Sequence, residues 1–80
     1  SGLVVATRST LPPNMSRITV RLPIKHQGIE ATVLLSGKVD FSLKSQNNRP
    51  GFFNLQLTGI QEDEHPGIFA RWLNDPEPSE

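Results

Sequence analysis

Hydrophobic and polar residues alternate along residues 29–43, with Leu34 as the exception. The odd positions from Ile29 to Leu43 are apolar or glycine, and most even positions are polar. This period of two is typical of a β-strand with one buried face. A straight strand of that length would reach roughly 50 Å, because a strand rises about 3.3 Å per residue. We therefore predict one strand that bends at Gly37, where the missing Cβ permits a bulge.

A hairpin that turns at residues 36–38 is the alternative for the same stretch. A two-residue hairpin turn needs two positions that accept positive φ, and only Gly37 is well suited to that. The single curved strand is the simpler interpretation. Curved strands contribute to two sides of a small barrel, so the pattern predicts a mainly β fold with a small antiparallel β-barrel.

Three shorter segments also have strand patterns. Residues 3–7 form an apolar run that a proline-rich loop ends, and residues 16–22 alternate with their apolar side chains at even positions. Pro23 is expected to close that second strand, and residues 26–28 to turn into the long one. Residues 52–58 then resume the alternation with three side chains inward: Phe53, Leu55 and Leu57.

A helix at about residues 63–74 is expected to pack on the barrel. Acidic residues and Pro66 precede it, and a helix N-terminus favours both. Its apolar face carries Trp72, which we expect to close the core. The proline-rich acidic tail, residues 75–80, is expected to be disordered. The other apolar residues of the helix are Ile68, Phe69 and Leu73.

Composition limits the chain to one small domain, assigned to residues 1–74. It has 80 residues, no cysteine, and eight basic and eight acidic residues, so the formal net charge is zero. Packing alone must stabilise the fold, and the broad positive field that supports DNA, RNA or membrane binding is missing. Without a signal peptide or an apolar span of about 20 residues, the expected location is the cytoplasm.

The sequence offers little for catalysis. Its two histidines, His26 and His65, lack metal-ligand spacing, and Asp63 and Glu64 are better explained by a helix N-terminus than by acid/base chemistry. No phosphate-binding glycine loop or hydrolase nucleophile elbow is present. We expect neither an enzyme nor a metal site nor a resident cofactor.

Arg17 and Arg21 are the binding candidates. Residues four apart on a strand share a face, so the two guanidinium groups can grip phosphate together, although solvated strand arginines are the commoner case. Phe52 and Trp72 offer stacking surfaces for bases. Leu34 breaks the polar outer face, and beside Phe52 it suggests a patch for a protein partner.

The order of these elements resembles the PilZ domain after its central motif. The similarity covers Gly2 to about Asn74, through the Leu-Pro-Pro-Asn loop, the segment from Arg17 to Pro23, the long stripe, Phe53-Asn-Leu-Gln-Leu-Thr-Gly59 and the closing helix. The family implies a six-stranded barrel followed by a helix. It also implies a bacterial receptor for cyclic di-GMP that controls motility, surface polysaccharide or adhesion.

In that family an Arg-x-x-x-Arg arm and an Asp/Asn-x-Ser-x-x-Gly motif bind the ligand. Matching Gly2 to the last glycine makes Ser1 the residue before it, and nothing earlier is present. We therefore expect a fragment or a degenerate domain, whose ligand-binding residues would be Ser1, Gly2, Arg17 and Arg21. A second register, with Arg17-Ile-Thr-Val-Arg21 as the arm, is less favoured because this pair lies inside an alternating strand.

Two functions remain open from the sequence. One is a cyclic di-GMP receptor domain, and the other is a barrel that binds no nucleotide and serves as a protein-interaction module. If strands are missing, unpaired sheet edges also favour an oligomer.

Overall fold

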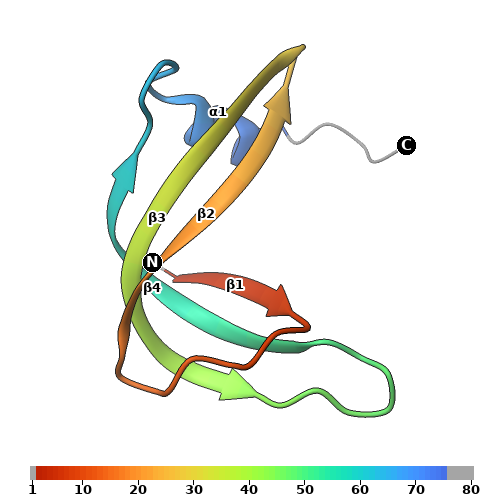
Figure 1. The fold of residues 1–80 in the computed structure, drawn as a ribbon. Helices are drawn as coiled ribbons and strands as arrows, with labels where there is room; N and C mark the ends of the chain where they lie inside the picture. Colours follow the sequence, from red (N-terminus) through yellow and green to blue (C-terminus); the bar gives the residue numbers. More distant parts are fainter. Residues whose placement is uncertain (1, 76–80) are drawn as a thin grey trace.

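Four antiparallel strands and one helix make up the fold in a computed structural model that describes residues 2–75 (Figure 1). The strands form one sheet in the order β1-β4-β3-β2. The sheet curls into a half-barrel, with α1 at its upper end (Figure 1). The elements are β1 (Gly2–Thr7), β2 (Arg17–His26), β3 (Ile29–Leu43), β4 (Gly51–Gln61) and α1 (Ile68–Asn74).

The long stripe is one curved strand, and the hairpin alternative is wrong. β3 runs unbroken through 15 residues, pairing with β2 along residues 29–38 and with β4 along residues 34–43. The β3–β4 register shifts between Ser36 and Gly37, at the predicted bend. A Cβ on Gly37 would lie 2.2 Å from the carbonyl oxygen of Gln56, so only glycine fits this approach.

A second register shift lies between Val39 and Phe41. Because of it, the prediction of which side chains point inward is wrong for the last residues of β3. One extra residue, Asp40, reverses the face to which each later side chain points. Phe41 and Leu43, predicted to be inward, lie on the outer face instead and are 52% and 46% exposed.

Two other strand ends differ from the predictions. β2 continues through Pro23 to His26, because it is an edge strand and an edge position tolerates a residue without an N–H donor. β4 extends to Gln61 rather than ending at Thr58.

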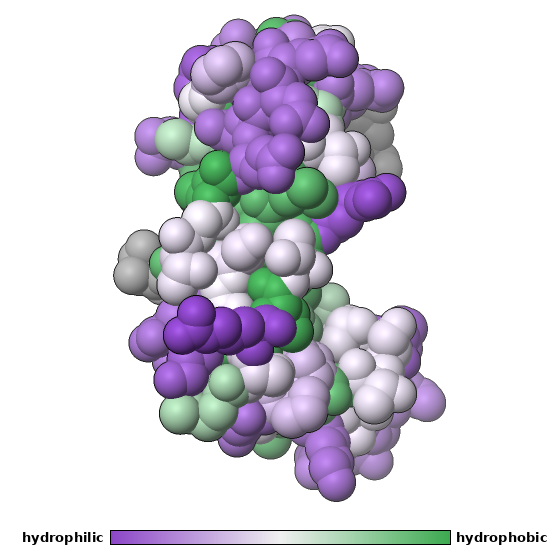
Figure 2. Space-filling model, turned by 60° about the vertical axis from the view of Figure 1, so that its left-hand side comes forward, coloured by the Kyte–Doolittle hydropathy of each residue, from purple (hydrophilic) through white to green (hydrophobic). Residues whose placement is uncertain are grey.

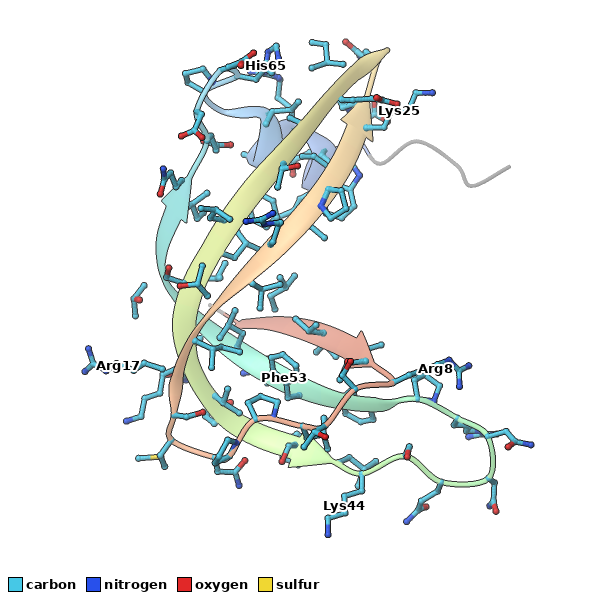
Figure 3. The ribbon with its side chains drawn as sticks, viewed as in Figure 1. Arg8, Arg17, Lys25, Lys44, Phe53 and His65 are labelled. Atoms are coloured by element: carbon cyan, nitrogen blue, oxygen red, sulfur yellow. The ribbon has the colours of Figure 1, made fainter. Side chains whose placement is uncertain are left out.

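The core fills the concave side of the sheet and the space under α1. Phe53 points into the curl, whereas Arg17 points away from its outer side (Figure 3). On α1, Ile68 and Phe69 are buried, and Trp72 stacks on Phe69 with ring centroids 6.1 Å apart. The buried apolar residues are Ile24, Val33, Leu35, Val39, Phe53, Leu55, Ile68 and Phe69.

The helix is shorter than predicted, because it begins at Ile68 and not near residue 63. Gly67 has a φ of 85°, a left-handed conformation that separates Pro66 and the acidic segment from the helix. The first turn has no acidic residue. Glu62, which precedes the helix in the sequence, provides the negative charge at its N-terminus instead. The N–H groups of Gly67 and Phe69 donate to its two carboxylate oxygens at 3.0 and 2.8 Å.

The mainly β class with one C-terminal helix is therefore confirmed. Within residues 2–75 the barrel is open, since β1 and β2 are opposite edges of the sheet and do not pair with each other. No helix in this part of the chain is long and apolar enough to cross a bilayer. The predicted disorder of the tail concerns residues that, beyond Asp75, lie outside the described part, as does Ser1.

Candidate functional site

One row of residues crosses the convex face of all four strands. The strand registers place Gly2 beside Gln56, Gln56 beside Lys38, and Lys38 beside Arg17. Neighbouring strands lie about 4.8 Å apart, so this convex row is roughly 14 Å long. Of the predicted ligand residues, Gly2 and Arg17 therefore occupy the two ends of one row.

The convex row carries two positive charges without acidic partners. Within residues 2–75, no hydrogen bond or ion pair engages the side chain of Arg17 or Lys38. Arg17 is exposed and Lys38 is half-buried, and the guanidinium of Arg17 extends away from the ribbon (Figure 3). These donors are free to bind an anion from solvent.

Arg21 lies on the same outer face as Arg17, but not in the convex row. It pairs with Leu34, and the Thr19–Ser36 pair stands between the two arginines. The hydroxyl groups of that pair are 3.0 Å apart. The Cα atoms of two strand residues four apart are separated by about 13 Å, so the two arginines flank one surface without converging on one atom.

Polar side chains surround the Gly2 end of the row. The Asn54 amide lies so close that a Cβ on Gly2 would be 2.6 Å from its Oδ1 atom. Asn54 Nδ2 donates to Asp40 Oδ1 at 2.7 Å. Asp40 is the extra residue of the second bulge, so the bulge supplies a carboxylate next to the row. The missing side chain of Gly2 thus gives space to the Asn54 amide at this end of the row.

An apolar patch adjoins the row on the same face. Phe41 and Phe52 have ring centroids 6.1 Å apart and planes inclined by 36°. Figure 2 shows hydrophobic atoms exposed among hydrophilic ones on the side that carries the bend of β3 and β4. The strand registers define the apolar patch as Val4, Ala6, Phe41, Leu43 and Phe52.

The expected patch of Leu34 with Phe52 does not form on this sheet. Leu34 pairs with Arg21 and Gln61 at the upper end of the register, whereas Phe52 pairs with Ala6 and Leu43 at the lower end. Trp72 lies on α1, stacked on Phe69, and does not contribute to the convex row.

The acidic and histidine candidates lie elsewhere. A cavity of about 250 Å³ at the upper end of β3 is lined by Glu62, Asp63, Glu64 and His65, among others. His26 is only 4% exposed, and its Nδ1 atom has no partner. Within residues 2–75, no three histidine or acidic side chains form a group suited to a metal ion.

The environment of Glu62 perturbs its carboxylate clearly. The N–H of Phe69 and then that of Gly67 stabilise its charged form, and Arg71 adds a favourable charge. Together these outweigh the opposing effect of burial and lower the pKa of Glu62 from its ordinary value of 4.5. This carboxylate holds the start of α1 and has no part in the convex row.

Comparison with family models, with curated proteins and with solved structures found no match for this chain.

Proposed function

We propose that the convex row binds cyclic di-GMP, and that the chain is a PilZ-like receptor domain through which this bacterial messenger regulates motility, exopolysaccharide or adhesion. The observation that carries the proposal is the pair of cations, Arg17 and Lys38, unneutralised in one row with Gly2. The proposal is of a binding domain and not of an enzyme.

The residues around the row match the chemistry of a guanine dinucleotide. Arginine and lysine donate to phosphate oxygens, and arginine also binds the O6 and N7 edge of guanine. The Asp40 carboxylate accepts from the N–H groups of the guanine pairing edge. Phe41, 52% exposed, offers a face on which a base stacks.

The same surface supports a second candidate, a protein-interaction module that binds no nucleotide. The specific observation is the apolar patch, where Val4 is 66% and Leu43 is 46% exposed. Contiguous apolar surface of this kind is typical of a protein-binding site. In the first candidate the charged row provides the affinity for a nucleotide, and in the second the apolar patch provides the affinity for a protein.

Calorimetric titration of the 80-residue chain with cyclic di-GMP separates them. We expect Arg17→Ala and Lys38→Ala each to weaken binding about tenfold, which is close to 1.4 kcal/mol. Absence of heat at micromolar ligand would contradict the receptor and leave the interaction module.

Lys25→Ala is the matched control for the titration. Lys25 is exposed on the same strand as Arg17 but pairs with Glu30 near the other end of β2. Its removal should leave the affinity unchanged. An equal loss in all three variants would show a diffuse effect of charge, and the row would not be the site.

A further inference from the structure

The two edges of the sheet have opposite characters. β2 carries Arg17, Arg21 and Lys25 along its length, and Pro23 removes one donor from it. Charged side chains and proline are the usual protections of an edge strand against pairing with another chain. In addition, α1 packs against β2 (Figure 1). The β2 edge is therefore protected.

The β1 edge has none of these protections. Its six residues, Gly-Leu-Val-Val-Ala-Thr, include no charge and no proline. In the described part of the chain β1 pairs only with β4, and no backbone hydrogen bond from a loop engages residues 2–7. The polar backbone groups on its free side are a template for another strand.

We propose that β1 pairs antiparallel with β1 of a second copy of this chain, around a two-fold axis at Val4. A two-fold interface must be self-complementary, and a neutral strand paired with itself brings no like charges together. The same pairing through β2 would set the basic side chains of one copy against those of the other. The charge pattern thus selects β1 as the edge and an identical chain as the partner.

The register follows from the two faces of β1. Pairing must keep inner residues opposite inner residues, which centres the axis on Val4 or Val5. The Val4 register places Val4 opposite its counterpart and Leu3 opposite Val5 of the second copy. The Val5 register would instead place Leu3 opposite Thr7. Only the Val4 register covers both of the half-buried residues Leu3 and Val5 with apolar partners. It also sets Val4 of one apolar patch against Val4 of the other.

Sedimentation equilibrium without ligand tests this dimer. The wild-type chain should show twice its 8.9 kDa mass at the upper end of a micromolar to millimolar series. Val4→Lys should shift it to the monomer, because two lysines would face each other across the axis. Thr32→Lys, at an exposed convex position of β3 far from β1, should remain dimeric. A monomeric wild type, or a Val4→Lys variant that still dimerises, would overturn the proposal.

Disulfide trapping tests the register independently of affinity. The chain has no cysteine, so single substitutions are clean probes. Directly opposed residues on paired antiparallel strands have Cα atoms about 4.5 to 5.5 Å apart, within disulfide range. Mild oxidation should link Val4→Cys chains efficiently and leave Thr32→Cys chains unlinked. Equal linking of both variants would contradict pairing at Val4. The titration with cyclic di-GMP tests a separate proposal, because the Arg17 and Lys38 variants lie on β2 and β3 and leave β1 unchanged.

Discussion

At the scale of single residues, Gly37 shows how a backbone contact limits side-chain choice. Its φ is not in the left-handed region, so conformational freedom is not the reason for glycine. The reason is the carbonyl of Gln56, which occupies the space of a Cβ. Backbone atoms of two paired strands cannot move apart without loss of their hydrogen bonds.

Gly37→Ala should therefore destabilise the fold by at least about 1 to 3 kcal/mol, the usual cost of overpacking. Urea denaturation followed by tryptophan fluorescence measures this change. Gly59→Ala is the control, because the nearest atom to its added Cβ would be 3.9 Å away. Equal stability of the two variants would show that the strands separate easily at the bend.

Glu62 predicts a pH dependence of stability. Its pKa is lowered in the folded chain, so the stabilisation is fully present above the unfolded value near 4.5 and is lost as pH falls toward the lower, folded value. Glu62→Gln should cost about 1 kcal/mol at neutral pH, as loss of a helix cap does. The difference in melting temperature between wild type and variant should shrink below pH 4.5. A constant difference down to acid pH would contradict the role of the carboxylate charge.

At the scale of elements, alternation predicted β3 and its bend, but not its second bulge. Glycine marked the first register shift, whereas nothing in Val39-Asp40-Phe41 departs from alternation. That bulge depends on how β4 pairs with β3, which is a tertiary property. The helix start was predicted five residues early, because acidic residues and Pro66 suit a first turn equally well inside or outside the helix.

The residues of the convex row were also only partly predictable from the sequence, because strand pairing decides which of them lie together. Arg17 was identified from the strand pattern, but Lys38 was not. A turn at Gln27 and Gly28, both with positive φ, sets Arg17 opposite Lys38 by counting along the hairpin. Gln56 and Asn54 could not be found by counting, because two register shifts separate β3 from a simple pairing with β4.

The helix should contribute stability mainly through the side chains that face the sheet. Trp72 is half-buried and stacks on Phe69, so Trp72→Ala should cost about 2 to 3 kcal/mol, less than for a fully buried tryptophan. Leu73 is 48% exposed, and Leu73→Ala should cost less than about 1 kcal/mol. Chemical denaturation followed by circular dichroism gives both values. Similar costs for the two variants would show that α1 docks through another face.

At the scale of the whole molecule, the two faces of one sheet have different roles. Its concave side and α1 hold the apolar core, while the convex side carries the charged row and the apolar patch. Residues that determine stability and residues of the proposed binding surface alternate along the same strands. Substitutions on the outer face therefore leave the core contacts intact, which makes each proposed site separately testable.

The bulge at Asp40 also has a consequence for how such a surface arises. If Asp40 paired with Asn54 in a regular ladder, Phe41 and Leu43 would stay in phase with the interior. The way in which one residue pairs is thus enough to decide whether two apolar side chains lie inside a small protein or on its surface. Deletion of Asp40 would instead remove the bulge and leave Phe41 opposite Asn54, so the apolar surface would persist.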